Sequence, residues 1–406
     1  MKKNKIIALA LAVIMSVALF AACSTGGTDD AATEAPAAAT EAPAEAPAAE
    51  APAEEAPAAE EAPAEEAAVP DEEEEAASVD GEVESLVNNL ANFENKTESE
   101  IIAAAPMDET DWASLTIGFS QMENNMPWRI AQTESMQAAA DKYGVNYIYA
   151  DAQSDSAKQA SDIEDMIAQG CDYIVLAPRV EEGLDRILKT AREQGTEVII
   201  VDRMTTAVPG QDYMTNIVTN LPTEGLQAGE WLVNAMTEKY GEPKGNAVTL
   251  QGTAGAAATI GRQNGFLRAI EGTDIQIIAD QYAEFTLADA QAAMENILQA
   301  HGDEIDMVFC HSDEMCLGAI QAIEAYGLVP GVDILIAGVD GQGTAFEDIK
   351  AGRQNITVTC DPFYGESSFA AIATVEAGGT VPPWIQKEGE LITPENVEEK
   401  WDLAFF

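Results

Sequence analysis

The residues with the most evident binding chemistry follow directly after apolar runs of the sequence. The run LTIGFS precedes the stretch QMENNMPWRIAQ, residues 121–132, in which Trp128 and Arg129 are adjacent. The run VIIV ends in Asp202 and Arg203. An indole ring offers a flat apolar face, and a carboxylate beside a guanidinium places an acceptor next to a five-donor fork. Charged partners of this kind strengthen hydrogen bonds to a polar molecule.

Catalytic and metal-binding patterns are absent from the sequence. Its two histidines, His301 and His311, stand in neither an HExxH arrangement nor another metal-ligand spacing. No GxSxG elbow, P-loop or strand-to-helix GxGxxG is present. Asp202 and Asp340 could be read as paired carboxylates, but no further acid or base accompanies them. We therefore expect no catalytic activity, no metal and no cofactor.

An alternation of short apolar runs with helix-length amphipathic stretches extends from about residue 113. The intervening segments, such as RIAQTESMQAAADKYG, repeat apolar residues at helical spacing and end in Gly, a common helix C-cap. Strands this apolar, each followed by a helix, indicate parallel sheets covered on both faces. The pattern restarts after TEGLQAGEWLVNAMTEKYGEPKG, so the sequence predicts an α/β fold of two doubly wound parallel-sheet lobes. The ten runs are LTIGFS, VNYIYA, YIVLAP, VIIVDR, YMTNIVTN, NAVTLQG, IQIIADQY, DMVFCHS, DILIAGVD and ITVTCDP.

The carboxyl ends of these runs are unusually polar. In doubly wound sheets, ligands bind beyond the carboxyl ends of the strands. The residues at these ends are therefore the candidates for a binding site: 120–129, Asp202 and Arg203, 251–262, Phe285, Ser312 and Asp313, Asp340, and 359–361.

The first residues have the composition of a secretory signal peptide. Residues 1–22 combine a basic start with a mostly apolar run. Cys23 follows Ala-Ala and resembles the lipobox cysteine of bacterial lipoproteins, which becomes the acylated mature N-terminus. The lipobox usually has Leu three residues before the Cys, where this chain has Phe20. Simple cleavage and release is one alternative, and an uncleaved anchor helix is the other.

Residues 23–80 comprise Cys23 and an acidic Ala/Pro/Glu segment, which we predict to be a disordered linker. The segment has no Lys or Arg, and its prolines interrupt helices. It either carries the lobes through a cell-wall layer or only keeps them soluble. Residues 81–112 are a lead-in segment to which the sequence assigns no role. The whole chain has a formal charge of −51, and without a basic cluster beyond its first residues we expect no nucleic-acid partner.

Four further cysteines stand within or beside apolar runs. No CxxC or Cys/His metal spacing connects them. We expect buried free thiols, and a disulfide formed after export is the alternative. The four are Cys171, Cys310, Cys316 and Cys360.

A family resemblance covers residues 115 to about 385. The motifs that carry it are the first loop ending in PWR, VIIVDR, LQGTAGAAATIGRQNGF, FCHSDEMCLGAIQAI and DILIAGVDG. In this order they resemble the type I periplasmic sugar-binding proteins, and the galactofuranose-binding type above all. The resemblance implies two lobes joined by a three-segment hinge, which close over a sugar. It implies an N-terminal lobe of 113–219 plus about 361–385, and a C-terminal lobe of 220–360 plus the tail 386–406.

The resemblance assigns four ligand-binding residues to the first lobe. It implies that Trp128 stacks on the apolar face of a sugar ring. Ribose-binding members have a second aromatic residue where this chain has Arg129, so a donor fork replaces one stacking face. Asp202 and Arg203 match the Asp-Arg pair of the family, in which acceptor and donor can hold neighbouring hydroxyls.

Five ligand-binding residues are implied in the second lobe. Arg262 matches the ligand arginine of the family, Phe285 its aromatic residue and Asp340 a hydroxyl-binding carboxylate. Ser312 stands where ribose-binding members have Asn, and Thr359 where they have Gln. These departures leave the exact sugar open.

Structural roles are the alternatives for several of these residues. Trp128 could fill a gap under the first helix, Phe285 could belong to the core, and Arg262 could be a solvated helix residue. Asp202 and Arg203 could form an ion pair, although adjacent strand residues point to opposite faces. Secondary candidates for ligand contact are Ser120, Asn125, Asp361 and Asp313, the last of which we interpret mainly as a helix N-cap.

Together these features predict an extracytoplasmic lipoprotein that captures a monosaccharide similar to galactofuranose, ribose or galactose. Its expected partners are an ABC importer permease and, through the lipid on Cys23, the outer face of the cytoplasmic membrane. We expect a monomer. A sensor that presents sugar to a chemoreceptor or kinase is the alternative, since the fold alone does not separate the two. A transcription regulator is disfavoured, because a signal peptide and an acidic linker precede the lobes.

Overall fold

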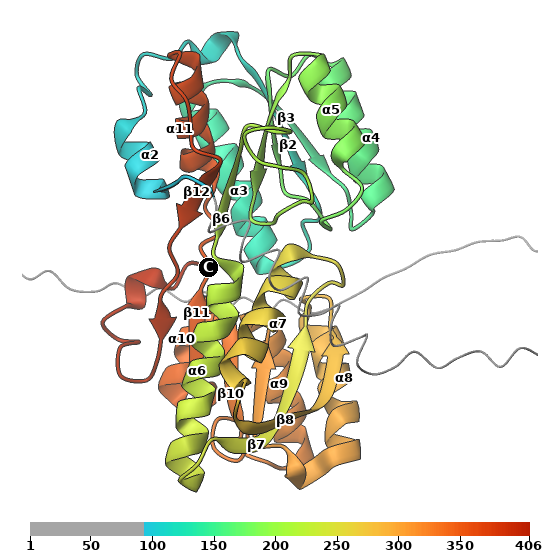
Figure 1. The fold of residues 1–406 in the computed structure, drawn as a ribbon, viewed down its shortest axis with the longest axis vertical. Helices are drawn as coiled ribbons and strands as arrows, with labels where there is room; N and C mark the ends of the chain where they lie inside the picture. Colours follow the sequence, from blue (N-terminus) through green and yellow to red (C-terminus); the bar gives the residue numbers. More distant parts are fainter. Residues whose placement is uncertain (1–92) are drawn as a thin grey trace, which may run out of the picture. The chain divides into compact units, whose positions relative to one another are not determined.

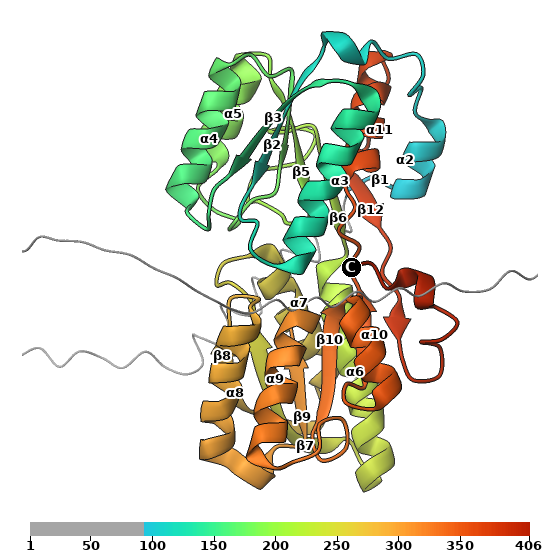
Figure 2. The ribbon, with the colours of Figure 1, turned by 180° about the vertical axis from the view of Figure 1, so that it is seen from behind.

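Two β-sheets organise the part of the chain that this computed structural model describes, residues 93–406. The predicted signal peptide, Cys23 and the predicted linker lie outside the described residues. Each sheet has helices on both faces, and Figures 1 and 2 show the resulting two lobes from opposite sides. Within residues 93–406, no helix has the length and apolar character needed to cross a bilayer.

The first lobe is built on a seven-stranded sheet in the order β1-β12-β6-β5-β4-β2-β3, with all neighbours parallel. Helices α2, α3 and α11 cover one face, and α4 and α5 cover the other (Figure 1). The strands are β1 (Asn95–Thr97), β2 (Thr116–Gln121), β3 (Asn146–Asp151), β4 (Tyr173–Leu176), β5 (Glu197–Val201), β6 (Thr215–Thr219) and β12 (Trp384–Lys387). The helices are α2 (Glu98–Ala104), α3 (Pro127–Tyr143), α4 (Ser156–Ala168), α5 (Asp185–Glu193), α11 (Gly365–Glu376) and the 3₁₀ turn η1 (Trp112–Ser114).

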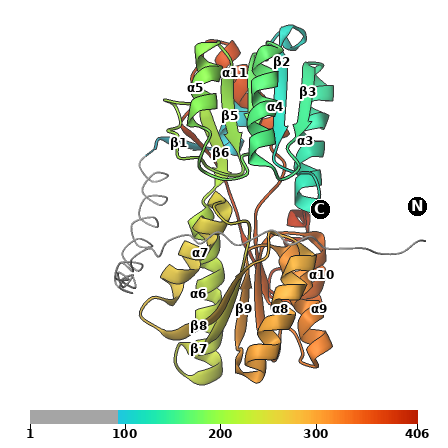
Figure 3. The same cartoon turned by 90° about the vertical axis from the view of Figure 1, so that its right-hand side faces the viewer.

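The second lobe is built on a six-stranded sheet in the order β13-β11-β10-β9-β7-β8, in which only β13 is antiparallel to its neighbour. Figure 3 shows α6 and α7 on one face and α8, α9 and α10 on the other. The strands are β7 (Lys244–Gln251), β8 (Asp274–Tyr282), β9 (Met307–Cys310), β10 (Leu335–Asp340), β11 (Ile356–Thr359) and β13 (Leu391–Ile392). The helices are α6 (Leu221–Tyr240), α7 (Ala257–Ile270), α8 (Leu287–His301), α9 (Asp313–Tyr326), α10 (Gly343–Ala351) and the 3₁₀ turns η2 (Gly302–Glu304) and η3 (Trp401–Leu403).

The predicted α/β fold is confirmed, and the ten apolar runs correspond in order to β2 through β11. Central strands such as β4 and β9 are buried along their whole length, as parallel strands between two helix layers must be. Several helices end at a glycine in the left-handed conformation, including α3 at Gly144 and α6 at Gly241. The four cysteines of the lobes are buried and none is in a disulfide, as the sequence predicted.

Three connections carry the chain between the two sheets. They run from β6 to α6, from β11 to α11, and from β12 to β13. Lys387, at the end of β12, is almost completely buried and binds Glu98 at 2.9 Å and Asp361 at 3.0 Å. Its ammonium lies 4.6 Å from the centre of the Tyr364 ring. This amine therefore joins α2, β12 and the β11–α11 connection at one point.

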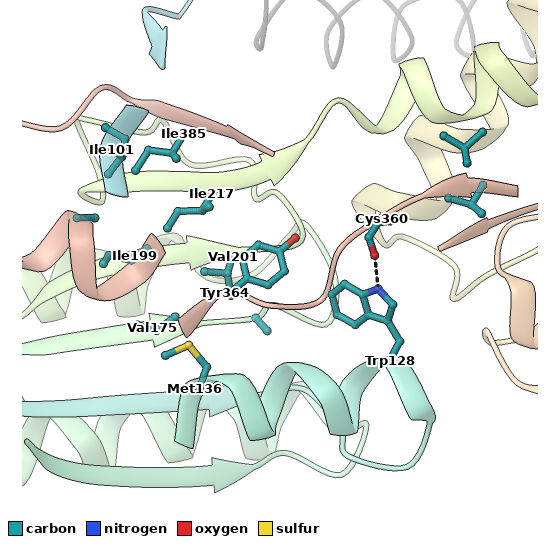
Figure 4. Packing of buried hydrophobic residues seen from close by; sticks show 14 of the residues in the cluster. Ile101, Trp128, Met136, Val175, Ile199, Val201, Ile217, Cys360, Tyr364 and Ile385 are labelled. Atoms are coloured by element: carbon teal, nitrogen blue, oxygen red, sulfur yellow. Dashed lines mark hydrogen bonds between the residues drawn. The ribbon is translucent and has the colours of Figure 1, made fainter. Parts of the chain in front are cut away.

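Residues 93–112 contribute to the first lobe. Strand β1 pairs with β12 at the edge of the sheet, and α2 packs against α11. Thr97 and Glu100 form a capping box at the start of α2. Ile101 and Trp112 join the hydrophobic core, part of which Figure 4 shows.

Candidate ligand-binding site

A cavity of about 450 Å³, open solvent at its mouth included, is lined by side chains of both lobes. The first lobe contributes Met126, Pro127, Trp128, Arg129, Asp202 and Arg203. The second lobe contributes Ala258, Arg262, Phe285, Ser312, Glu314, Asp340, Gln342 and Phe406.

The carboxyl ends of the strands position these side chains. Asp202 follows β5, Asp340 ends β10, and Phe285 lies in the turn between β8 and α8. All three have a positive φ, of 69°, 128° and 61° in the order Asp202, Asp340, Phe285. A non-glycine residue held in this region costs about 1–3 kcal/mol, and such strain concentrates at functional sites. Among the described residues, three of the six non-glycine positions with a positive φ line the cavity.

Trp128 lies in the first turn of α3, directly after Pro127, and is held from two sides. Its indole N–H donates to the carbonyl of Cys360 at 2.8 Å, as Figure 4 shows. Its ring centre lies 6.1 Å from that of Tyr364, and the Arg129 guanidinium lies 4.6 Å from the Trp128 ring centre. The hydrogen bond ties the first lobe to the end of β11 and fixes the orientation of the indole. Trp128 therefore packs in the core and also presents part of its surface to the cavity.

Arg129 is a buried cation paired with Asp202. Its Nη2 lies 2.6 Å from Asp202 Oδ2, and its Nη1 donates to Gln132 Oε1 at 2.8 Å. Gln132 is in turn held by Gln121 at 2.9 Å. The contact with Asp202 is an ion pair without hydrogen-bond alignment, so Oδ2 keeps acceptor capacity.

Arg203 lies across the cleft from Phe285. Its guanidinium lies 5.4 Å from the ring centre, and its Nη1 donates to the carbonyl of Arg179 at 2.5 Å. Its Nε is 3.7 Å from Asp202, so the adjacent pair interacts only weakly. Both residues follow the end of β5, so the alternation of strand faces does not explain this distance. Burial, reinforced by the positive charge of Arg129, lowers the pKa of Arg203 to about 9. The group remains a cation at neutral pH and lacks a hydrogen-bond partner for Nε.

Arg262 is buried on α7 and all three guanidinium nitrogens have protein partners. Its Nε donates to Glu224 at 2.8 Å, its Nη1 to the carbonyl of His311, and its Nη2 to Asp340 at 3.3 Å. The solvated-helix alternative for this residue is wrong. Burial raises the pKa of Asp340, and the charge of Arg262 opposes that effect.

Close packing of α6 and α7 brings Arg262 to Glu224. A Cβ added to Gly225 would lie 1.9 Å from the carbonyl oxygen of Arg262, and one added to Gly265 would lie 2.0 Å from that of Pro222. Only glycine permits this backbone approach. A third glycine, Gly252, makes room for the Phe285 ring, since a Cβ there would lie 1.9 Å from the ring.

The two lobes contact each other directly. The N–H of Glu181 donates to the carbonyl of Gly255 at 3.1 Å, and the Arg203–Phe285 contact spans the same cleft. With the Trp128–Cys360 hydrogen bond, these contacts describe a closed arrangement. Over residues 93–406, no group of three or more His, Cys, Asp or Glu side chains is placed to hold a metal ion.

Comparison with known proteins identifies the family. Residues 117–380 match the family described as "Periplasmic binding protein domain". The chain belongs to the periplasmic binding protein family. Proteins of this family bind solutes outside the cytoplasm and are not enzymes.

Sugar-binding proteins are prominent among the relatives of this periplasmic binding protein. It is 35% identical over 292 residues to the galactofuranose-binding protein YtfQ of Escherichia coli (strain K12), covering 71% of this chain and 91% of the relative. It is 34% identical over 260 residues to the ribose import binding protein RbsB of Bacillus subtilis (strain 168), covering 64% and 80%. A solved structure of the arabinose ABC transporter binding component from Shewanella sp. ANA-3, bound to L-arabinofuranose, is 35% identical with a TM-score of 0.67, covering 71% and 95%.

Thr359 lies outside the cavity of this periplasmic binding protein, although the sequence grouped it with the site. Its hydroxyl accepts the N–H of Glu390 at 2.8 Å, and its N–H donates to the carbonyl of the same residue. These bonds hold the β12–β13 connection against β11. Thr359 lines a second groove beside the hinge instead.

The secondary candidates also lie outside the cavity lining. Ser120 is fully buried in β2, Asn125 is exposed in the loop before α3, and Asp361 binds Lys387. Asp313 is not the N-cap of α9, because Ser312 holds that position and accepts the N–H of Met315 at 3.3 Å.

Asp313 is instead buried below the β10–α10 turn, which it holds in place. Its carboxylate accepts the N–H groups of Gly341 and Gln342 at 2.9 and 3.0 Å and the hydroxyl of Thr357 at 2.8 Å. Burial raises its pKa to about 7, and a hydrogen bond from Gln354 opposes that effect most strongly. Through these hydrogen bonds, Asp313 fixes the turn that carries the cavity residues Asp340 and Gln342.

The predicted candidates did not include three of the residues that line the cavity. Glu314 follows Ser312 by two positions, and Gln342 follows Asp340 by two positions, so wider strand-end windows would have included them. Phe406 carries no local sequence pattern that indicates a site. Met126, Pro127 and Ala258 lie within the predicted ranges 120–129 and 251–262, although the sequence assigned them no individual role.

Proposed function

We propose that this periplasmic binding protein captures a monosaccharide between its two lobes. The observation that carries the proposal is the cavity lining: aromatic rings of Trp128 and Phe285 stand beside buried guanidinium and carboxylate groups. A sugar ring has an apolar C–H face and a rim of hydroxyls, and this lining offers a partner for each. Charged hydrogen-bond partners in a nearly dry cleft favour a dissociation constant on the order of micromolar or tighter.

We assign the sugar contacts as follows. Trp128 and Phe285 contact the ring faces, and Arg129, Arg203 and Arg262 donate to hydroxyl oxygens. Asp202 and Asp340 accept from hydroxyls, and Ser312 offers a shorter polar group. Direct contact between Thr359 and the sugar is a weaker proposal, because Thr359 lines the hinge groove and not the cavity.

The ligand we propose is galactofuranose-like, ribose-like or galactose-like. The relatives named for galactofuranose and ribose and the arabinofuranose-bound structure support this range. Within it, Arg129 favours a ligand that offers a hydroxyl oxygen where ribose-binding members supply a second aromatic face.

Delivery to an ABC importer permease is the biological role that we propose. We further propose that Cys23 carries a lipid, which tethers a monomeric protein to the outer face of the cytoplasmic membrane. The relatives are named as import or transporter components, which supports the importer role and gives the sensor alternative no support.

Sugar binding would favour the closed arrangement because only there do both lobes contact the ligand. We propose that the lobes, 113–219 with about 361–385 and 220–360 with 386–406, move about the three connections. Lys387 lies at these connections, next to Asp361.

Calorimetry against a panel of pentoses, hexoses and their furanose forms tests the proposal. We expect one or a few monosaccharides to bind and to raise the melting temperature. If no member of the panel binds or raises it, the proposed sugar capture is wrong.

A further inference from the structure

The last residues of the described chain form a wall of the cavity. We call residues 401–406 the strap; it begins with η3 and ends at Phe406. Figures 1 to 3 all place this end of the chain at the level between the two lobes. Phe406 lines the ligand cavity beside Asp340 and Gln342. Phe406 also packs, partly buried, against the hydrophobic cluster that contains Trp128.

Backbone hydrogen bonds fix the strap to the loop that carries the cavity residues. The N–H of Phe405 donates to the carbonyl of Gly341 at 3.1 Å, and the N–H of Gly343 donates to the carbonyl of Phe406 at 2.7 Å. A Cβ on Gly341 would lie 3.2 Å from the Leu403 carbonyl oxygen. The glycines of this loop therefore let the strap lie directly against it.

Side-chain packing anchors the strap on both flanks. Leu403 and Ala404 pack on a buried cluster of Phe346, Ile349, Ile392 and Val397. The ring of Phe405 meets that of Phe363 edge-on with a centre-to-centre distance of 6.1 Å. Phe363 belongs to the β11–α11 connection, so the strap is held by the second lobe and by the hinge.

The strap lies between two hollows. Phe406 lines the ligand cavity, whereas Leu403 and Phe405 line the hinge groove that also contains Thr359 and Glu224. Glu224 binds Arg262 at 2.8 Å and Arg262 lines the cavity, so the two hollows are close neighbours. The strap therefore bounds the cavity on the side of the hinge.

We propose that Phe406 is a specificity-determining residue that limits the ligand to one sugar ring. The inference rests on the proposed capture of a monosaccharide. The Phe406 ring contacts the apolar surface of the bound sugar and occupies the space into which a further substituent would extend toward the hinge groove. Sugars carrying a second ring or a bulky glycosidic group are excluded by this side chain.

The test compares three variants by calorimetry: Phe406→Ala, Phe406→Leu and the control Tyr326→Ala. Tyr326 is an exposed aromatic residue at the end of α9 and does not line the cavity. The ligands are the best monosaccharide of the wild type, its methyl glycoside and a disaccharide that contains it. Thermal unfolding without sugar shows whether each variant is folded.

For Phe406→Ala we expect a roughly tenfold loss of monosaccharide affinity, since one aromatic contact disappears. The preference for the monosaccharide over its larger derivatives should fall by at least the same factor. Phe406→Leu should lie between Phe406→Ala and the wild type, and Tyr326→Ala should match the wild type. If Phe406→Ala does not fold, the ligand preference of Phe406→Leu is compared with that of the wild type instead.

Two results overturn the inference and they are distinguishable. A wild type that binds a monosaccharide while the Phe406 variants keep its preference among the three ligands shows that the strap does not set specificity. A wild type that binds no sugar at all removes the proposed function, and the inference falls with it.

Discussion

The two sides of the cavity differ in how completely their charged groups are bonded. In the second lobe, every guanidinium nitrogen of Arg262 has a partner within the protein. In the first lobe, Asp202 Oδ2 and Arg203 Nε have no aligned hydrogen bond although both are buried. Buried groups left without partners are costly, so they are the groups that gain most from a ligand. The second lobe presents a preorganised cation, and the first lobe keeps hydrogen-bonding capacity for the sugar.

Removing the Arg262 side chain should change stability and sugar affinity more than any other substitution considered. Arg262→Ala leaves Glu224 and Asp340 buried without their cation, which should lower the free energy of unfolding by about 3 kcal/mol. Sugar affinity should fall by roughly 100-fold or more. Arg268→Ala, at an exposed position of the same helix, is the matched control for chemical denaturation and calorimetry. If the two variants have the same stability and the same sugar affinity, Arg262 is not the preorganised cation that distinguishes the second lobe from the first.

Replacing the cation of the first lobe should change which sugar is preferred. Arg129→Phe removes the partner of Asp202 and restores the second aromatic face of ribose-binding members. We expect a loss of roughly 10- to 100-fold for the wild-type ligand, with a smaller loss for ribose. Calorimetry with both sugars gives the ratio of their dissociation constants in the wild type and in the variant. If this ratio is the same in both proteins, Arg129 does not determine sugar preference and serves only to hold Asp202.

The close contact between α6 and α7, which positions Arg262, can be tested by a substitution that changes no charged residue. In Gly225→Ala the new Cβ would meet the Arg262 carbonyl oxygen at 1.9 Å, so α6 and α7 must separate. We expect the free energy of unfolding to fall by about 2–3 kcal/mol. Sugar affinity should fall as well, since Arg262 moves with its helix. Asn234→Ala, at an exposed position of α6, should change neither quantity.

The smallest expected effect is a pH dependence from His311, whose carbonyl accepts from Arg262. Burial, followed by the charge of Arg262, lowers the pKa of His311 well below its ordinary value of 6.5. Below pH 6.5 the unfolded chain binds a proton that the folded protein does not, so this residue lowers stability as the pH falls. The contribution approaches about 1.4 kcal/mol per pH unit.

The measurement compares unfolding of the wild type and of His311→Gln between pH 7.5 and 5. The wild type should lose stability relative to the variant as the pH falls. Parallel curves for the wild type and His311→Gln would contradict the assignment.

The sequence predicted what depends on local pattern. Apolar runs identified β2 through β11, and the rule that ligands lie at strand ends placed Asp202 and Asp340 at the cavity. Strand β12 was missed because its sequence, WIQK, is half polar and follows Pro382 and Pro383. It therefore does not stand out as an apolar run, and its pairing with β1 and β6 determines its conformation.

The other features that the sequence did not predict depend on contacts between residues far apart in the chain. Glu224 and Arg262 lie 38 residues apart and meet only because two helices approach at Gly225 and Gly265. Phe406 reaches the cavity through backbone pairing with residues 341–343. Thr359 has the polar character of a strand-end ligand, yet its hydroxyl is used by the β12–β13 connection.

The position of β12 between β1 and β6 fixes an order of events as the chain is made. Residues 384–387 are needed to complete the first sheet, whereas the parallel strands of the second sheet, β7 to β11, are all present by residue 359. The first sheet, which begins earlier in the sequence, is therefore completed only after the parallel part of the second sheet. Until β12 arrives, the edge of β6 is an unpaired template for other strands. A nascent chain of this protein needs protection at that edge until nearly its whole length has been synthesised.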